Sequence, residues 1–303
     1  MSDEAPARIA ITGASGLIGS ALSSALQRDA CEVHPLVRTL RGAPREIQWD
    51  PGTGQIDAGA LEGFDAVVHL AGENIGQRWT PEVRERILES RVSGTQLLAR
   101  TLASLRHPPE VLVSASAVGY YGDCGDRPLD ESAPAGNDFL AEVAQAWEAA
   151  AKPAAEAGIR VVHPRSGMVL SRHGGALARM LPPFRLGLGG RMGNGRQWTS
   201  WIALDDEVAA IRFLIGTPTL AGPVNVTSPR PVTNAEFTRI LGRVLGRPTL
   251  MTVPAAALRL AFGEMADRTI LASQRAHPAR LLDAGFHFRH ARLEDGLRAL
   301  LAP

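Results

Sequence analysis

The sequence contains very little lysine, tyrosine or cysteine. Of its 32 basic residues 31 are arginine, so Lys152 is the single lysine, and Tyr120 and Tyr121 are the two tyrosines. A mechanism that needs a lysine therefore has one candidate, and one that needs a phenol has two. The two cysteines, Cys31 and Cys124, are too few for a disulfide framework or a cysteine zinc site, so we expect a reduced cytoplasmic protein without a metal centre.

The chain also lacks a strong charge of either sign and a long apolar run. Its 32 basic and 31 acidic residues give a formal net charge of +1, which provides no strong field for attracting nucleic acid or a membrane surface. No apolar run is long enough to span a bilayer. We expect its partners to be a small-molecule substrate and, in a homodimer, a second copy of the chain, with no nucleic acid and no membrane.

A glycine-rich segment near the start predicts a dinucleotide phosphate site. The β-branched run at residues 8–12 leads directly into this segment, and apolar residues at helical spacing follow it. Gly13 permits the tight turn, Gly16 lets the backbone approach a pyrophosphate, and Gly19 lets the helix pack closely. An ordinary strand-to-helix turn is the alternative. The predicted cofactor contacts are Gly13, Ser15, Gly16, Leu17, Ile18 and Gly19.

The end of the second predicted strand bears on the choice of cofactor. Residues 32–37 read as this strand, and Arg38 follows it where a carboxylate would bind the ribose of NAD. An arginine there suits the 2′-phosphate of NADP, and a carboxylate would repel that phosphate. The sequence therefore predicts NADP, although a solvated loop arginine is the alternative for Arg38.

The remaining pattern alternates strands with helices. Residues 65–70 and 111–114 are buried-strand runs, separated by a helical stretch over about 81–105. Leu70, Ala71 and Gly72 are predicted to let the cofactor pass close to a strand end. The expected fold is α/β: a Rossmann-type, doubly wound parallel sheet with a smaller C-terminal substrate region.

Several motifs resemble the extended short-chain dehydrogenase/reductase superfamily. They comprise the glycine-rich turn, His69-Leu70-Ala71-Gly72, Ser114-Ala115-Ser116 with Tyr121-Gly122, and Pro164-Arg165-Ser166-Gly167. Within it, the chain is similar to the epimerase-like subfamily of the human short-chain dehydrogenase family 39U protein and the bacterial YfcH-type proteins. The resemblance implies an NADP-binding Rossmann domain at 1–163 and a substrate-side region at 164–303 that is interleaved with the Rossmann sheet.

The superfamily's usual acid–base pair, a tyrosine and a lysine four residues apart on one helix, is missing. Tyr120 and Tyr121 are followed four residues later by Cys124 and Gly125, and Lys152 is preceded four residues earlier by Glu148. The Asn-x-x-Gly-Thr motif is also altered, because residues 91–95 place an arginine where the asparagine belongs. These coupled losses indicate a rebuilt catalytic site.

The polar residues that remain are the site candidates. Ser116 is predicted to hydrogen-bond a substrate carbonyl, and Tyr121 or Tyr120 is the candidate acid. Ser114 is included among the cofactor contacts. Arg91 is expected to bind a cofactor phosphate or an acidic substrate, with a surface salt bridge as the alternative. Arg165 is expected to hold a carboxylate or phosphate, with a structural ion pair as the alternative.

Two functions from different classes fit these residues. The first is an NADPH-dependent oxidoreductase, or an epimerase that uses transient hydride transfer on a small or nucleotide-linked substrate. The second is a catalytically idle NADP(H)-binding sensor or scaffold, which the missing tyrosine–lysine pair favours. The glycine-dense segment at 187–195 is expected to be a flexible substrate lid, with a plain hairpin as the alternative.

Overall fold

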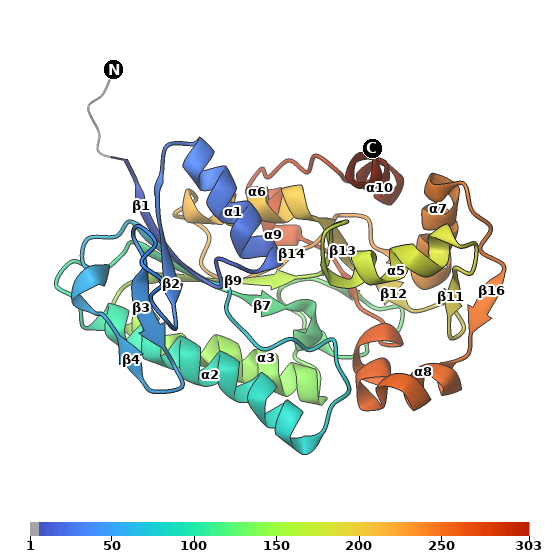
Figure 1. Cartoon of the computed structure of the whole chain (residues 1–303), viewed down its shortest axis with the longest axis horizontal. Coiled ribbons are helices and arrows are strands. Elements are labelled where there is room, and N and C mark those ends of the chain that lie inside the picture. The colour runs from blue at the N-terminus through green and yellow to red at the C-terminus, as the bar shows by residue number, and fades with distance from the viewer. Residues whose placement is uncertain (1–5, 303) are drawn as a thin grey trace.

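A mostly parallel β-sheet forms the centre of the protein (Figure 1). The computed structural model describes residues 6–302, so the first five residues and the last residue of the two predicted domains lie outside the described part. The strands of this sheet are β1 (Arg8–Thr12), β2 (Glu32–Val37), β3 (Ile47–Asp50), β4 (Gln55–Ile56), β5 (Ala66–His69), β6 (Val111–Ser114), β7 (Ser116–Ala117), β9 (Arg160–Ser166) and β14 (Gly222–Val226).

The strand order is β14-β9-β6-β5-β1-β2-β3-β4, with β7 beside β9. Every pair is parallel except β3 with β4. The chain path changes direction at β1: β2, β3 and β4 follow on one side of β1, and β5, β6, β9 and β14 follow on the other. In a doubly wound sheet, ligands bind at the carboxyl ends of the strands beside such a reversal. Those ends are Thr12, His69, Ser114 and Ser166.

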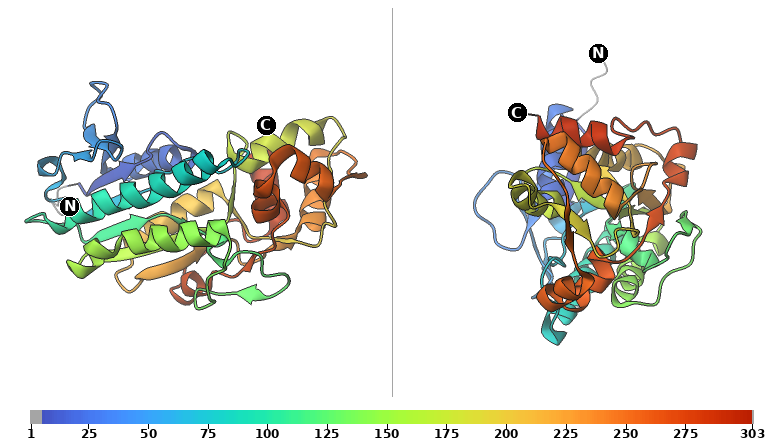
Figure 2. Two further views of the ribbon diagram at one scale, coloured as in Figure 1. Left: turned by 90° about the horizontal axis from the view of Figure 1, so that it is seen from below. Right: turned by 90° about the vertical axis from the view of Figure 1, so that its right-hand side faces the viewer.

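Helices cover both faces of the sheet, as Figure 2 shows. Helices α1 (Leu17–Arg28) and α6 (Leu204–Ile215) pack on one face, and α2 (Pro81–Ala103), α3 (Phe139–Ala150) and α4 (Lys152–Glu156) lie on the other. The alternation of side chains along β1 explains the two layers, because Ile9 and Ile11 join one buried cluster and Ala10 joins the other. The predicted α/β Rossmann-type fold is therefore confirmed.

Local sequence signals set the ends of several helices. Thr80 caps α2 by accepting the N–H of Val83, and Asp138 caps α3 by accepting the N–H of Ala141 at 3.0 Å. A capping box begins α7 (Asn234–Leu245): the Thr233 side chain accepts the Glu236 N–H, and the Glu236 side chain accepts the Thr233 N–H.

The C-terminal segments form short sheets and helices beyond one end of the main sheet, on the right in Figure 1. Their core contains Leu170, Trp201 and Phe237. Four two-stranded sheets pair β10 (Met168–Leu170) with β13 (Trp201–Ala203), β11 (Gly190–Met192) with β16 (Met251–Val253), β12 (Trp198–Thr199) with β15 (Val232–Thr233), and β8 (Pro128–Leu129) with β17 (Arg275–Ala276). The other helices are α5 (Gly175–Arg185), α8 (Ala255–Phe262), α9 (Ala279–Asp283) and α10 (Leu293–Leu301).

The glycine-dense segment does not form the plain hairpin that was one alternative for it. Its residues 190–192 form β11, which pairs in parallel with β16 about sixty residues later in the chain rather than folding into a hairpin. Within residues 6–302, no helix is long and apolar enough to cross a membrane.

Candidate functional site

The glycine-rich turn after β1 leaves no room for a side chain at Gly13 or Gly19. Gly13 has a φ of +68°, and a Cβ atom on it would lie 2.9 Å from the backbone of Leu70 and Ala71. A Cβ on Gly19 would collide with the Gly13 carbonyl oxygen. The Gly16 N–H is bonded to the Gly13 carbonyl, and the first bond inside α1 runs from the Ser20 N–H to the Gly16 carbonyl. The N–H groups of residues 17–19 between these two bonds are therefore free for an anionic ligand.

A buried threonine–histidine pair fixes this turn to the end of β5. Thr12 Oγ1 accepts the N–H groups of Leu70 at 3.1 Å and Ala71 at 3.2 Å, and its hydroxyl lies 2.7 Å from His69 Nδ1. Because the oxygen accepts two bonds, we assign the hydroxyl hydrogen to Nδ1. Burial, and secondarily the charge of Arg91, lower the pKa of His69 to about 4, so the ring stays neutral and can accept that hydrogen.

A cleft of about 380 Å³ lies along the carboxyl ends of the strands, next to this turn. Its walls come from the turn and α1, from α2 and α3, from the ends of β5, β6 and β9 with β7, and from β10, α5 and α6. Eight of the predicted site residues line it: Gly13, Gly16, Leu17, Ile18, Gly19, Leu70, Arg91 and Ser116. The other predicted residues do not line it: Ser15, Arg38, Ala71, Gly72, Ser114, Arg165, Tyr120 and Tyr121.

Arg91 brings a positive charge to the cleft wall. Its guanidinium donates to the carbonyl groups of Glu73 and Ile87, both at 3.1 Å, and lies 4.9 Å from the Trp147 ring centre. It makes no salt bridge with a carboxylate of residues 6–302. Burial lowers the pKa of Arg91 to about 10, and the charge of Glu73 opposes this shift. Arg91 therefore fits an anionic ligand in the cleft.

Ser116 belongs to a buried network that the sequence did not reveal. Its hydroxyl donates to Glu148 Oε1 at 2.7 Å. Glu148 in turn receives two parallel bonds from Arg165, from Nε to Oε1 and from Nη2 to Oε2, each at 2.8 Å. Arg165 is 2% exposed. Burial alone would lower the pKa of Arg165, but the hydrogen bonds and charge of Glu148 raise it above its ordinary value.

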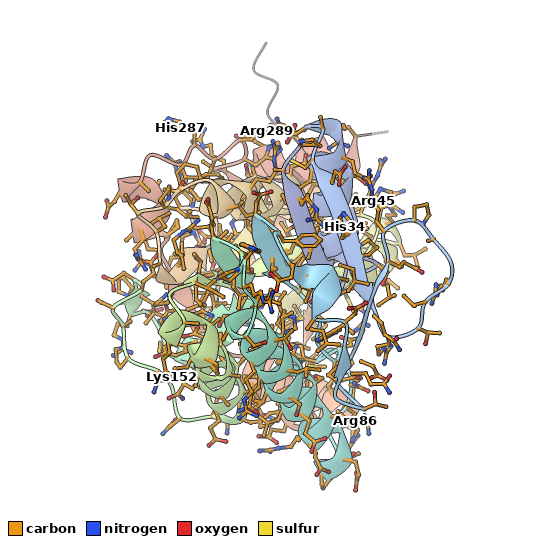
Figure 3. All side chains as sticks on the ribbon, turned by 90° about the vertical axis from the view of Figure 1, so that its left-hand side faces the viewer. His34, Arg45, Arg86, Lys152, His287 and Arg289 are labelled. Atoms are coloured by element: carbon orange, nitrogen blue, oxygen red, sulfur yellow. The ribbon has the colours of Figure 1, made fainter. Side chains whose placement is uncertain are left out.

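Both tyrosines lie against Arg165. Tyr121 is 1% exposed, and its hydroxyl donates to Asn225 Oδ1 at 2.7 Å and accepts from Arg165 at 3.1 Å. Burial raises the pKa of Tyr121 to about 12, against the opposing effect of Arg165. The Tyr120 ring centre is 3.4 Å from the guanidinium carbon of Arg165. Lys152 takes no part in this group: it is exposed at the surface and pairs with Glu156 (Figure 3).

The remaining predicted residues occupy different environments. Arg38 is exposed directly after β2, and none of its side-chain atoms is hydrogen-bonded or ion-paired within the described chain. Ser15 and Gly72 are exposed, and Ala71 is half-buried. Ser114 is fully buried at the end of β6, and its hydroxyl has no hydrogen-bond partner among residues 6–302.

Glu207 is a further acid in the cleft wall. It lies in the first turn of α6, is 1% exposed, and accepts the Ser166 hydroxyl at 2.6 Å. Burial raises the pKa of Glu207 from 4.5 to about 7, with the Ser166 bond opposing the rise. The sequence places it in an Asp-Asp-Glu run at a helix start, which is typical of solvated acids, so only the packing of α6 against β9 reveals its burial.

The raised pKa of Glu207 predicts a pH-dependent stability. From about pH 4.5 to about pH 7 the unfolded chain releases a proton that the folded protein keeps, so stability falls as pH rises through this window. We expect Glu207→Gln to be more stable than the wild type by about 3 kcal/mol at about pH 8, with little difference near pH 4. Urea unfolding at both pH values measures this, with Asp205→Asn in the same turn as the control. An equal gain at both pH values would contradict it.

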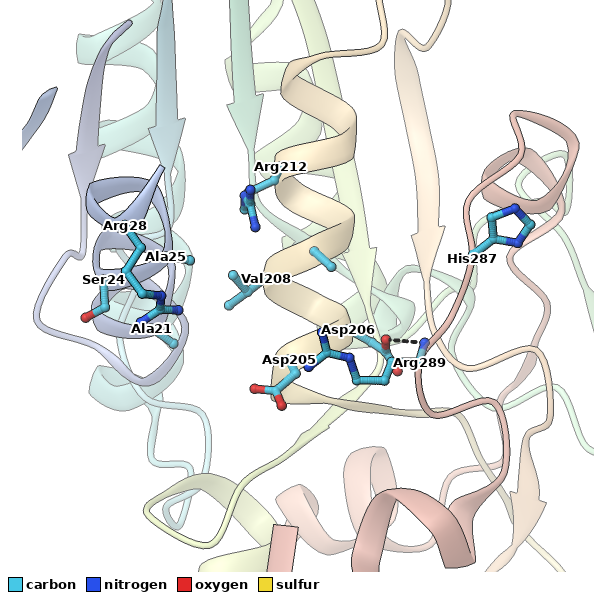
Figure 4. Close-up of a pocket in the computed structure, with 11 residues that line it drawn as sticks. Ala21, Ser24, Ala25, Arg28, Asp205, Asp206, Val208, Arg212, His287 and Arg289 are labelled. Carbon is cyan, nitrogen blue, oxygen red and sulfur yellow. Dashed lines mark hydrogen bonds between the residues drawn. The ribbon is translucent and has the colours of Figure 1, made fainter. Parts of the chain in front are cut away.

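A second pocket, of about 390 Å³, lies between α1 and α6 (Figure 4). It shares no lining residue with the cleft. Two of its charged side chains already have partners: Arg212 is ion-paired with Asp29, and Asp206 accepts the backbone N–H groups of Arg289 and His290 at 2.8 Å each. The free helix end, Arg91 and the Ser116 network instead favour the cleft as the functional site.

Family models and known relatives match most of the chain. The model of the NAD dependent epimerase/dehydratase family matches residues 9–226, and a domain of unknown function (DUF1731) matches residues 253–300. The epimerase family protein Mb2239 of Mycobacterium bovis is 48% identical over 297 residues, covering 97% of each chain.

Solved structures are similar as well. The human epimerase family protein SDR39U1, crystallised with NADPH, has a TM-score of 0.89 at 34% identity, covering 97% of this chain and 98% of that one. The UDP-glucose 4-epimerase of Thermus thermophilus in complex with NAD has a TM-score of 0.72 at 19% identity, covering 96% of each chain, and this likeness concerns the fold alone.

Proposed function

Because the chain belongs to the NAD dependent epimerase/dehydratase family, we propose that it binds NADP(H) in the cleft and catalyses hydride transfer on a small or nucleotide-linked substrate. The observation that carries this proposal is that one cleft holds the free N-terminal end of α1, Arg91 and the Ser116–Glu148 pair. A pyrophosphate fits the first two groups, and a reacting substrate fits the third.

NADP is preferred over NAD because of the end of β2. Arg38 is exposed there and has no partner among the described side chains, so it is available to a 2′-phosphate. The human relative that was solved with NADPH supports the same choice. We propose that residues 1–163 hold the cofactor and that residues 164–303 provide the substrate side.

The hydride chemistry belongs to the bound nicotinamide, whereas the chain's residues position the substrate and its proton. The single hydrogen of the Ser116 hydroxyl is directed to Glu148, which leaves the oxygen lone pairs to accept a hydrogen from a substrate hydroxyl group. Glu148 is the base: it accepts the Ser116 hydrogen while Ser116 takes the proton of the substrate hydroxyl group. The two bonds from Arg165 hold Glu148 in place. Glu148 thereby takes the place of the missing tyrosine–lysine pair.

The tyrosines are a second choice for the proton-transfer group. The hydroxyl of Tyr121 is engaged by Asn225 and Arg165, and its pKa is raised to about 12, which makes it a poor acid–base group near neutral pH. Tyr120 packs its ring on the guanidinium of Arg165, whereas the Ser116 hydroxyl is bonded to Glu148 and not to this phenol.

A catalytically idle NADP(H)-binding sensor or scaffold is the alternative, and the absence of the tyrosine–lysine pair favours it. The two functions differ in turnover. A screen of hydroxyl and carbonyl substrates, followed by the absorbance of NADPH, should give turnover that Ser116→Ala reduces by roughly a hundredfold. Tight NADPH binding with no turnover on any substrate would instead favour the sensor.

The preference for NADP predicts a specific effect of Arg38. We expect Arg38→Ala to weaken NADPH binding by about tenfold and to leave NADH binding unchanged, since only NADPH has the 2′-phosphate. Calorimetric titration of both cofactors measures the ratio, and Arg41→Ala in the same loop is the control. An equal loss for both cofactors would show that Arg38 does not contact this phosphate.

A further inference from the structure

One oxygen of a buried carboxyl group in the cleft is unused. Glu207 Oε1 accepts the Ser166 hydroxyl at 2.6 Å, whereas Oε2 has no hydrogen-bond partner within residues 6–302. The side chain is 1% exposed and forms no salt bridge with the described cations. A buried carboxyl oxygen without a partner is costly, and it indicates a site that a ligand completes.

The surroundings of Glu207 make it a recognition group. It is part of the cleft wall, and the neighbouring wall is mainly apolar. A single polar atom in an apolar wall fixes the orientation of a ligand rather than supplying general affinity. The apolar residues of this part of the wall are Leu17, Ile18, Met168, Val169 and Ala176.

The chemistry of a carboxyl oxygen restricts the ligand group. A carboxylate accepts hydrogen bonds and repels phosphate, so its partner is an N–H or O–H donor and not the pyrophosphate beside Arg91. Glu207 is bonded to Ser166 at the end of β9, whereas Arg38 follows β2. In the sheet order β9 lies on one side of β1, beyond β5 and β6, and β2 lies on the other side. The cofactor group near Glu207 is therefore at the end opposite the adenosine.

We propose that Glu207 Oε2 accepts a hydrogen bond from the N–H of a primary carboxamide, namely that of the nicotinamide ring. This assignment rests on the proposed function, because it takes the dinucleotide as the occupant of the cleft. Glu207 thus orients the ring, and Ser166 orients Glu207.

Two nucleotides that differ in this one group test the assignment. NADP⁺ carries the carboxamide, and its 3-acetylpyridine analogue carries a methyl ketone that has no N–H. At about pH 8 we expect the wild type to bind NADP⁺ at least about tenfold more tightly than the analogue. Glu207→Leu should bind the two nucleotides equally, and Glu207→Gln, whose amide oxygen still accepts a bond, should keep the preference.

Adenosine 2′,5′-bisphosphate, which has no nicotinamide, shows that the variants are folded, because it should bind all of them as it binds the wild type. Asp205→Ala, an exposed change in the same turn, should keep the wild-type preference. A Glu207→Leu variant that still prefers NADP⁺ by the wild-type factor would overturn the role of Glu207 alone. A wild type that binds none of the three nucleotides would overturn the proposed function as well.

Discussion

Replacing Arg165 by methionine is expected to lower the free energy of unfolding by about 3–5 kcal/mol. Arg165 is 2% exposed, and its two bonds to Glu148 are each 2.8 Å long. Its loss leaves a largely buried carboxylate without its counter-charge and removes a bond from the Tyr121 hydroxyl. Urea unfolding followed by tryptophan fluorescence measures the change, because the chain has five tryptophans.

The double variant Arg165→Met with Glu148→Leu separates a lost charge partner from lost packing. A buried ion pair that is replaced as a whole by apolar groups often costs little, so the double variant should recover most of the loss. Lys152→Met is the matched surface control, since the exposed Lys152–Glu156 pair should contribute under about 1 kcal/mol. The prediction would be contradicted if Arg165→Met were as stable as this control. It would also be contradicted if the double variant were less stable than both Arg165→Met and Glu148→Leu alone.

Replacing Gly16 by valine is expected to weaken NADPH binding by about a hundredfold or more, which corresponds to about 3 kcal/mol. Gly16 lines the cleft at the N-terminal end of α1. Its φ of −75° is open to other residues, so the variant should fold. The added methyl groups would occupy the space through which a pyrophosphate reaches the free N–H groups of the helix.

Calorimetric titration with NADPH measures this loss, and a thermal melt without cofactor shows whether the fold is intact. Ser20→Ala serves as the control, because Ser20 is an exposed residue of α1 outside the cleft lining. Unchanged NADPH affinity in a folded Gly16→Val protein would mean that the cofactor does not approach the turn.

The fold could be predicted from sequence where local signals agree with the packing. The β-branched run at residues 8–12 forms β1, and the second predicted strand at residues 32–37 forms β2, both with the predicted bounds. The family resemblance based on the glycine turn and the strand-end motifs is confirmed by the comparisons. In contrast, the pairing of β11 with β16 depends on a contact distant in sequence, for which the glycine-dense segment gives no local sign.

The candidate site could be predicted only in part for the same reason. The glycine turn is contiguous in sequence, so its glycines identify it as a candidate phosphate site. The Glu148–Arg165 pair instead joins α3 to β9, and the pairing of Ser116 with Glu148 appears only when these elements pack together. The sequence showed that the usual tyrosine–lysine pair was missing but could not show what replaces it.

The most direct test of NADP(H) binding in the cleft is a calorimetric titration of the wild-type protein with NADPH and with NADH. We predict one NADPH site per chain and an affinity for NADPH at least about tenfold higher than for NADH. Binding of neither cofactor, or equal affinity for both, would contradict the assignment of the glycine turn, Arg91 and Arg38 to an NADP site.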